Sequence, residues 1–269
     1  MFYKGEYHII GENIKKSPFS KLKVIELVQP WSNDGYFVLN DKIFSIEPGC
    51  VFVLNAFETH CVNTPDINKF CRNKIIIDYD YLLTLFDKIN IPESTISSFQ
   101  NNPVFYFNIQ DRSPYELDLL FKKAAEAYDD PSNIGFAEFI TATIETFLFL
   151  FRKSEKKIPI FIDNNKPINK AMEYINNNLY NENLSLDDIC ENCHTNKYYL
   201  CHTFKETTGI SVMKYIKERR INRAKQLLIE TDIKICDIGS MVGYPNASLF
   251  CKIFKQDVGC PPLKYRNIK

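Results

Sequence analysis

One pattern of residues occurs twice near the C-terminus of this chain, and it constrains the fold more than any other feature. The first copy extends from Ile189 to Tyr215 and the second from Ile238 to Tyr265. The copies are offset by 50 positions from Asn196 onward and by 49 positions before it. Each copy predicts a short helix, a tight turn and a second helix, so we expect two helix-turn-helix units in tandem.

The first copy has the spacing of apolar residues that buries one face of a helix. These residues are Leu184, Leu186, Ile189, Cys190 and Cys193. Ser185 is placed to cap the first helix, the chain turns at His194 and Thr195, and Asn196 can cap the second helix. The residues expected on the buried face of the second helix are Tyr199, Leu200, Thr203 and Phe204. The residues expected to point outward are Lys197, Tyr198, Cys201, His202 and Lys205.

The second copy turns at Gly243, Tyr244 and Pro245. Glycine supplies backbone freedom in the turn, proline stops the first helix, and Asn246 can cap the second helix. The residues expected on its buried face are Leu249, Phe250, Ile253 and Phe254. The residues expected to point outward are Ala247, Ser248, Cys251, Lys252 and Lys255.

The second helix of such a unit lies in the major groove of DNA, where its outward side chains reach base edges and phosphates. The outward residues of both copies, together with Asn246, are therefore the predicted DNA contacts. Small side chains such as Ala247 and Ser248 allow close approach to a base, and lysines suit guanine or phosphate. One long helix predicted from Val212 to Glu230, with Ser211 as its cap, would fix the separation of the two units.

The segment from about Lys166 to Lys269 resembles the DNA-binding domain of AraC/XylS-type bacterial transcription regulators. The matching residues are Leu200 to Gly209, Arg220-Ile221 with Ala224 and Leu227-Leu228, Asp237-Ile238-Gly239 with Val242-Gly243-Tyr244, Phe250 with Phe254-Lys255, and Gly259 to Pro262 with Tyr265-Arg266. The resemblance implies seven helices, two recognition helices that enter successive major grooves, and RNA polymerase as a partner. Departures from the family pattern are Cys190 and Gly239, where alanine is usual, and His194, where glycine is usual.

The charge of the chain is divided unevenly. The formal net charge is zero, which alone would argue against a nucleic-acid partner. Residues 166–269, however, hold 16 Lys and Arg against 11 Asp and Glu, whereas residues 1–165 hold 17 against 22. A half with a net charge of +5 is thus joined to a half with −5, and double-stranded DNA is the expected partner of the basic half.

Composition favours a cytoplasmic protein. We expect no signal peptide and no membrane partner, because the longest apolar stretch, Phe136 to Phe151, contains glutamates and threonines. Nine cysteines without framework spacing fit a reducing compartment.

The first hundred residues are rich in short predicted strands. These are Lys23 to Val28, Tyr36 to Leu39, Lys42 to Ile46, Val51 to Leu54 and Lys74 to Ile77. Close spacing of such strands predicts a small barrel or jelly roll. The stretch from Phe44 to Gly49, followed by His60, resembles part of the cupin-like barrel that many AraC-type regulators carry. The predicted class is therefore α+β, with an N-terminal cupin-like β-barrel followed by helices and a C-terminal all-α domain.

Two helices are predicted after the strands, from Pro114 to Tyr128 and from Ile134 to Lys153. The second is apolar on more than one side, so it needs more than one neighbour. Two interpretations stay open, namely burial within its own domain and a homodimer formed through residues 134–153. We predict residues 1–160 as an effector-binding and dimerisation domain, 161–167 as a linker and 168–269 as the DNA-binding domain. Its helix-turn-helix units are expected at about 185–206 and 235–256.

Several cysteines and histidines invite other chemistry. Cys190 to His194 matches the C-x-x-C-H string of c-type haem attachment, and a zinc site could draw on Cys190, Cys193, Cys201 and His202. Both require residues of the buried helix face, so buried thiols are the favoured interpretation and we predict no metal and no cofactor. Cys50, Cys61 and Cys71 beside His60 leave a thiol/redox- or metal-responsive regulator as an alternative.

The sequence predicts a DNA-binding transcription regulator, more specifically an activator, controlled by a small-molecule effector whose identity is unknown. Trp31, Tyr36 and His60 are candidate effector-binding residues, because aromatic walls with polar groups suit small metabolites. We predict no catalytic residues and no enzyme activity. The alternative of a cupin enzyme with an accessory DNA-binding domain is disfavoured, because only His8 and His60 lie outside the DNA-binding segment.

Overall fold

The chain folds into two compact units of the expected α+β class. The computed structural model describes residues 2–10, 23–31, 35–39, 42–47, 49–55, 60–101, 104–106, 113–153 and 166–267. The first unit comprises residues 1–35, 45–56 and 64–160, and the second comprises 36–44, 57–63 and 161–269. The second unit thus joins two short segments of the N-terminal half to the helical C-terminal half. The boundaries inferred from the sequence stay a prediction, and residues 161–165 of the predicted linker lie outside the described residues.

The first unit is built on a five-stranded sheet with the strand order β1-β7-β2-β5-β8. The strands are β1 (Tyr3–Ile10), β2 (Val24–Pro30), β5 (Cys50–Leu54), β7 (Cys71–Asp78) and β8 (Val104–Tyr106). Alternation along β2 and β7 sends Ile25 and Ile75 into one apolar cluster. Glu26 and Lys74 lie on the opposite face and form an ion pair at 2.6 Å.

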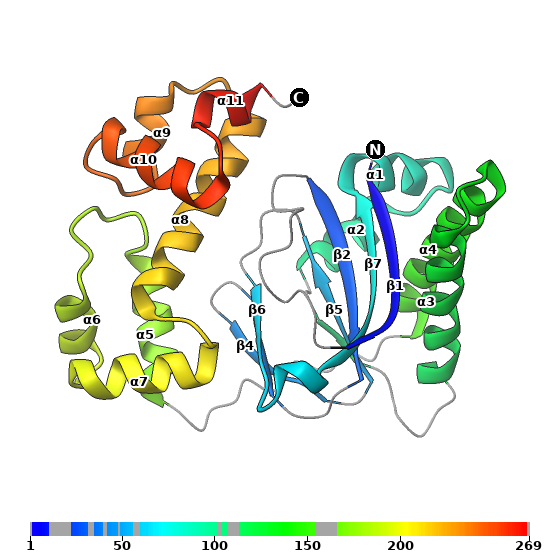
Figure 1. Ribbon diagram of the computed structural model, residues 1–269, viewed down its shortest axis with the longest axis horizontal. Helices are drawn as coiled ribbons and strands as arrows, with labels where there is room; N and C mark the ends of the chain where they lie inside the picture. The colour runs from blue at the N-terminus through cyan, green and yellow to red at the C-terminus, as the bar shows by residue number, and fades with distance from the viewer. Residues whose placement is uncertain are drawn as a thin grey trace. The chain divides into compact units, whose positions relative to one another are not determined.

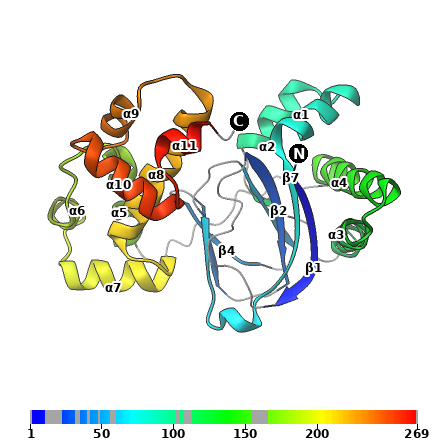
Figure 2. The same ribbon diagram turned by 45° about the horizontal axis from the view of Figure 1, so that its top comes forward.

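Helices cover one face of this sheet. They are α1 (Tyr79–Lys88), α2 (Glu93–Asn101), α3 (Ser113–Asp129) and α4 (Asn133–Lys153), with a short 3-10 helix η2 (Ile67–Lys69) before β7. Figures 1 and 2 show α3 and α4 lying side by side along the sheet. A Cβ atom on Gly5 would lie 2.6 Å from the carbonyl oxygen of Ala124, so α3 packs directly on the backbone of β1.

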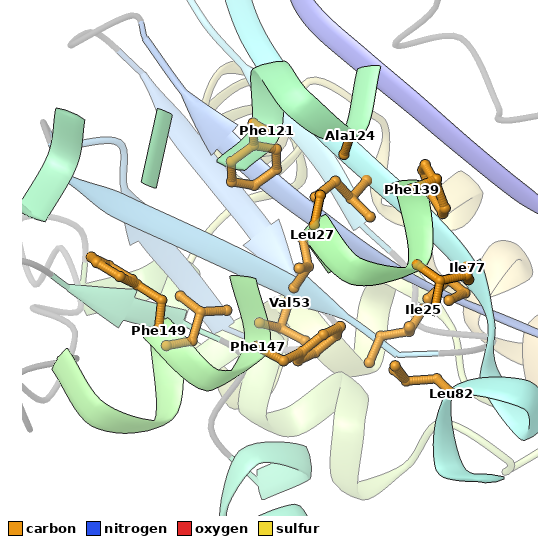
Figure 3. Close-up of a cluster of buried hydrophobic side chains, with 14 of the residues drawn as sticks. Ile25, Leu27, Val53, Ile77, Leu82, Phe121, Ala124, Phe139, Phe147 and Phe149 are labelled. Atoms are coloured by element: carbon orange, nitrogen blue, oxygen red, sulfur yellow. The ribbon is translucent and has the colours of Figure 1, made fainter. Parts of the chain in front are cut away.

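Aromatic side chains fill the core between these helices and the sheet. Phe121 and Phe139 are fully buried beside Leu27 and Ile77 (Figure 3). By length and hydropathy α4 could also cross a membrane, but 44% of its apolar window is buried within the protein. Its Phe149 also belongs to this core, which favours burial within its own unit. The homodimer through residues 134–153 stays a prediction.

Within its described residues, the second unit contains a three-stranded sheet and seven helices. The sheet has the order β4-β3-β6, made of β3 (Tyr36–Leu39), β4 (Lys42–Ser45) and β6 (His60–Asn63). The helices are α5 (Lys166–Asn177), α6 (Leu186–Asn192), α7 (Lys197–Thr208), α8 (Val212–Glu230), α9 (Ile235–Met241), α10 (Ala247–Val258) and α11 (Pro262–Arg266). The number of helices and the long α8 are as expected.

The strands do not form the one closed barrel that the sequence suggested. The described strands divide between two separate sheets, of five and three strands. Strands β1, β6 and β8 and helices α1 and α2 were not predicted. In β1 the register shifts between Glu6 and Ile9, and this irregularity breaks the alternation by which strands are recognised.

Helix caps in the second unit follow the sequence closely. Ser185 and Asp188 form a capping box at the start of α6. Asn196 and Asn246 each accept a hydrogen bond from the backbone N–H three residues later, at 2.8 Å. Gly209 and Gly259 end α7 and α10 in the left-handed conformation that only glycine adopts freely. The repeat in the sequence thus corresponds to a repeat of the residues that begin and end the helices.

Arg220 of α8 joins the two helix-turn-helix units. Its guanidinium donates to the carbonyl oxygens of Leu179 at 2.8 Å, Asn181 at 2.7 Å and Gly243 at 2.9 Å. The first two carbonyls precede α6, and the third lies in the turn between α9 and α10. Burial lowers the pKa of Arg220, because it removes water from the charged guanidinium. The three carbonyl oxygens replace that water as hydrogen-bond acceptors.

The turns of the two units differ at one equivalent position. His194 has φ 52° and Gly243 has φ 83°, so both are left-handed. A Cβ on Gly243 would lie 2.9 Å from the carbonyl oxygen of Tyr180 and 3.0 Å from the Arg220 guanidinium carbon. The first unit therefore carries backbone strain at His194, where the resemblance implies glycine, and the second leaves no room for a side chain.

We predict opposite effects of substitution at these turn positions. His194→Gly should raise the unfolding free energy by about 1 kcal/mol, because it relieves the left-handed strain. Gly243→Ala should lower it by more than about 1 kcal/mol, because strain and steric overlap add. Urea unfolding of both variants measures the two changes. Shifts of the same sign would contradict this account of the turns.

We also predict that the Arg220 guanidinium is essential to the second unit. Arg220→Met should lower the unfolding free energy by about 3 kcal/mol, because three buried carbonyls lose their charged donor. Arg223→Met on the same helix is the matched control, since Arg223 is exposed. Equal urea midpoints for the two variants would show that Arg220 does not hold the units together.

Candidate nucleic-acid interface

Helix α7 presents one buried and one exposed side. Leu200, Thr203 and Phe204 are buried, and Phe204 packs edge-on against Tyr215 of α8 with ring centroids 5.5 Å apart. The opposite side carries Lys197, Tyr198, His202 and Lys205 as exposed residues and Cys201 as a half-buried one. The five residues predicted to point away from the core therefore share one surface, which we call the α7 surface.

Helix α10 repeats the arrangement. Phe250 and Phe254 are buried, and Phe254 packs edge-on against Tyr265 of α11 at 5.5 Å. The residues predicted as contacts on the other side are exposed or half-buried: Asn246, Ser248, Lys252 and Lys255 are exposed, and Ala247 and Cys251 are half-buried. We call this set the α10 surface. In Figures 1 and 2, α8 runs from the α5–α7 group to the α9–α11 group.

Two residues expected in the core lie outside it. Tyr199 is 44% exposed and Leu249 is 38% exposed, although both were predicted to be buried. Each is the third residue of its helix, and its backbone N–H is the one bound by the capping asparagine. Side chains in the first turn point back toward the helix N-terminus, so they extend past the neighbouring helix. Ile253, also predicted to be buried, is half-buried.

We therefore add the exposed Tyr199 and Leu249 to the residues predicted to contact DNA. Their equivalent positions in the two copies, directly after a capping asparagine, are the signal that could have identified them. An apolar side chain at this place can contact a thymine methyl group, and a tyrosine can also reach a phosphate.

Two polar side chains of the α7 surface, Lys197 and His202, lie beside carboxylates of the same unit. Lys197 Nζ lies 2.6 Å from Asp187 of α6, and this hydrogen bond raises the pKa of Lys197. His202 Nδ1 lies 3.1 Å from Glu206, and the His202 ring stacks on Tyr198 with centroids 6.0 Å apart. DNA phosphates would compete with Asp187 and Glu206 for these groups.

The α10 surface is electrostatically simpler. Within the part of the chain that the structure describes, neither Lys252 nor Lys255 has an acidic partner. Lys217 of α8, by contrast, forms an ion pair with Asp257 at 3.2 Å. Lys252 and Lys255 can therefore bind phosphate without first breaking a salt bridge.

Cysteines of the first helix-turn-helix unit are buried as predicted. Cys190 and Cys193 lie in the core of this unit, and burial raises the pKa of both thiols. Among the described residues, no group of three His, Cys, Asp or Glu side chains is placed to hold a metal ion. Burial also raises the pKa of Cys50 to about 12 and raises that of Cys71. Raised pKa values disfavour the thiolate that a redox sensor needs.

The candidate effector residues lie in different places. Trp31 directly follows β2 in the first unit, whereas Tyr36 and His60 belong to the second. Tyr36 pairs with Asn63, and Leu39 pairs with His60, so Tyr36 and His60 are at opposite ends of the β3–β6 ladder. The His60 ring stacks on Phe37 with centroids 6.2 Å apart. Their role in effector binding stays a prediction.

Comparison with known proteins agrees with this geometry. A helix-turn-helix domain family model matches residues 189–268. The bifunctional transcriptional activator/DNA repair enzyme AdaA of Bacillus subtilis is 35% identical over 113 residues, which cover 38% of this chain and 53% of AdaA. The arabinose operon regulatory protein of Escherichia coli is 29% identical over 99 residues, or 37% of this chain and 34% of that protein. The chain thus spans about half or less of these two relatives.

A shorter relative is matched along most of its length. The probable transcription factor PqrA of Proteus vulgaris is 30% identical over 101 residues, which cover 37% of this chain and 83% of PqrA. The similarity therefore covers most of the length of this relative, and it falls on the part of the chain that has the two capped helix-turn-helix units. This chain belongs to the AraC/XylS-type family of DNA-binding transcription regulators.

Proposed function

We propose that the chain activates transcription in the cytoplasm by placing the α7 and α10 surfaces in successive major grooves of double-stranded DNA. The observation that carries this proposal is the repeated, capped and exposed helix on either side of α8, held by Arg220. Successive major grooves on one face of B-form DNA are about 34 Å apart. Two different surfaces predict an asymmetric site of about two helical turns.

Control by a small molecule is the second part of the proposal. It is supported by the three-stranded sheet, which comes from the N-terminal half but belongs to the same unit as the first helix-turn-helix. Val38 and Ile43 of this sheet share a hydrophobic cluster with residues of α5 and α7. A conformational change in the three-stranded sheet can therefore be transmitted to α7 through direct packing.

Asn63 makes the most specific of these contacts. Its side-chain amide donates to the carbonyl oxygen of Thr207 at 3.0 Å and to that of Glu206. Both carbonyls lie in the last turn of α7, where helix hydrogen bonding leaves acceptors unsatisfied. Gly259, which ends α10, has no neighbour within 4 Å of its would-be Cβ, whereas Gly209 has Asn63. Among the described residues, a side chain of the three-stranded sheet contacts the end of α7 but not that of α10.

Activation also requires partners beyond DNA. We propose RNA polymerase as the protein partner and a homodimer through residues 134–153 as the assembly that occupies two DNA sites. An effector changes the outcome only if its affinity differs between two arrangements of the protein. The alternative of a thiol-responsive regulator gains no support from Cys50 and Cys71, because burial raises the pKa of both thiols.

We predict that Lys252→Ala and His202→Ala both weaken DNA binding and that Lys252→Ala does so more. Lys252 has no acidic partner among the described residues, so its loss should lower the salt dependence of binding by about one phosphate contact. Gel shifts at several salt concentrations, on a genomic fragment that the wild-type protein selects, measure this. Lys88→Ala, which removes an exposed charge from α1, is the control. Unchanged affinity of both variants would remove these contact assignments.

We predict that Asn63→Ala loosens the end of α7 and leaves α10 unaffected. Because one hydrogen bond contributes about 1 kcal/mol, backbone amides near Thr207 should exchange with deuterium about fivefold faster. The equivalent end of α10 near Val258 is the internal control within the same molecule. Equal amide exchange rates in the variant and the wild type would show that the three-stranded sheet does not stabilise α7.

A further inference from the structure

A strained histidine lies at the edge of the five-stranded sheet. His8 has φ 50°, a left-handed conformation that non-glycine residues rarely adopt. It lies in the irregular stretch of β1 between Glu6 and Ile9, where Tyr7 and His8 together oppose Asn73 of β7. The backbone N–H of His8 donates to the side-chain oxygen of Asn73 at 2.8 Å. Strain of this kind is concentrated at ligand sites, so the surroundings of His8 are informative.

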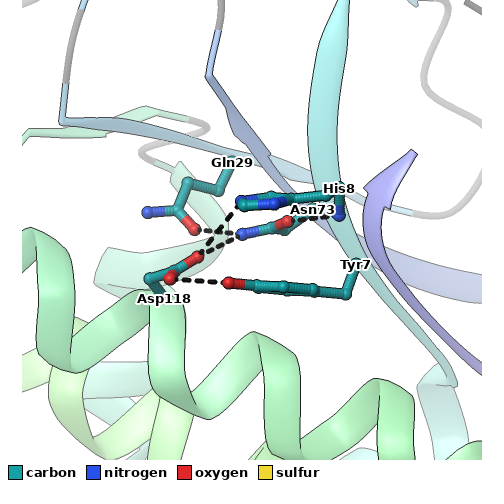
Figure 4. A network of polar contacts seen from close by, with 5 residues as sticks. All are labelled: Tyr7, His8, Gln29, Asn73 and Asp118. Carbon is teal, nitrogen blue, oxygen red and sulfur yellow. Dashed lines mark hydrogen bonds and ion pairs between the residues drawn. The ribbon is translucent and has the colours of Figure 1, made fainter. Parts of the chain in front are cut away.

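A polar network surrounds this bulge (Figure 4). The amide nitrogen of Asn73 donates to Gln29 and to Asp118 of α3, both at 2.9 Å. The Tyr7 hydroxyl donates to the other oxygen of Asp118 at 2.9 Å. Burial and the hydrogen bond to Asp118 raise the pKa of Tyr7 to about 12, so Tyr7 stays a donor near neutral pH. Both side-chain oxygens of Asp118 thus accept hydrogen bonds, which fix its orientation.

The imidazole of His8 adds little to the core. Its side chain is 47% exposed, and Nε2 lies 3.9 Å from the nearer Asp118 oxygen, which is too far for a direct hydrogen bond. It stacks on the Tyr7 ring with centroids 4.1 Å apart and meets the Trp31 ring edge-on at 5.2 Å. Trp31 is 40% exposed. An exposed indole therefore lies beside an imidazole and an oriented carboxylate.

We propose that His8, Asp118 and Trp31 form a binding site for a small, neutral, polyhydroxylated molecule. A hydroxyl oxygen can lie about 2.8 Å from both groups, donating to Asp118 and accepting from His8. Trp31 supplies the apolar wall that the carbon skeleton of such a ligand needs. An anion is disfavoured because Asp118 repels it. A cation is disfavoured because it offers the imidazole N–H of His8 no acceptor.

The site extends the effector prediction to a second set of residues. It retains Trp31 from the residues predicted from the sequence but takes its polar groups from Tyr7, His8 and Asp118. Tyr7, Gln29 and Asn73 lie on the face of the sheet that packs against α3. The inference rests on the proposed control of DNA binding by a small molecule.

Trp31 makes the proposal directly testable, because it is the single tryptophan of the chain. Selectively excited tryptophan fluorescence of the full-length protein therefore reports on this site alone. Common pentoses, hexoses and the corresponding polyols are titrated one at a time. At least one should change the fluorescence saturably, and Asp118→Asn and His8→Gly should each weaken that binding at least about tenfold.

Glycine at position 8 adopts the observed backbone without strain, so His8→Gly removes the imidazole and preserves the bulge. Asn90→Gly is the matched control, because Asn90 also has a positive φ, of 55°, and lies in the turn after α1. This control should bind like wild type. No saturable response to any compound, or binding that survives both site substitutions, would overturn the proposal. A saturable response only to alkylammonium compounds would overturn the ligand class.

Gel shifts on the same proteins separate the two levels of inference. If every variant binds DNA and no polyol alters fluorescence, the site is wrong and the DNA-binding function stands. If the wild-type protein selects no DNA fragment, the proposed function fails whatever the fluorescence shows.

Discussion

The geometry of the DNA-binding half depends on one buried cation. Arg220 extends from α8 and donates to backbone carbonyls of the segment between α5 and α6 and of the turn between α9 and α10. A charged group in this position is costly to bury, and only simultaneous binding of several acceptors offsets that cost. The two units can therefore not shift independently without leaving the guanidinium or a carbonyl unsatisfied. The separation of α7 and α10 therefore depends on these hydrogen bonds as much as on apolar packing.

The C-terminal half was largely predictable because its determinants are local. Ser185, Asn196 and Asn246 act on backbone groups three residues away, and Gly209 and Gly259 end the helices they follow. Arg220 shows the limit of such reasoning. Its position on the inner side of α8 follows from helical spacing, but its partners are main-chain carbonyls, which every residue has and which leave no mark in a sequence. Tyr199 and Leu249 were misplaced because helical spacing does not show where a neighbouring helix ends.

The N-terminal half was less predictable because its determinants are distant. β2 and β7 were recognised from β-branched runs, whereas β1 was missed because its register shift brings Tyr7 and His8 opposite a single partner. The apolar faces of β3 and β6 also cannot reveal which core they join. Val38 packs with helices that begin more than a hundred positions later. Contacts at such separations depend on the whole chain, so single-sequence patterns contain little information about them.

Helices α7 and α10 have the same pattern of caps and buried residues, but they differ in how readily their side chains could bind a phosphate. In the proposed complex, Lys197 and His202 of the α7 surface exchange the carboxylates of Asp187 and Glu206 for DNA phosphates, whereas Lys252 and Lys255 of the α10 surface have no such partner among the described residues. The exposed pairs contribute little stability in water, but each lowers the net gain when a phosphate replaces the carboxylate. The helix with the smaller electrostatic gain is also the one that Asn63 contacts. In the proposed complex, a modest change in packing therefore acts on the helix whose contact with DNA has the smaller electrostatic gain.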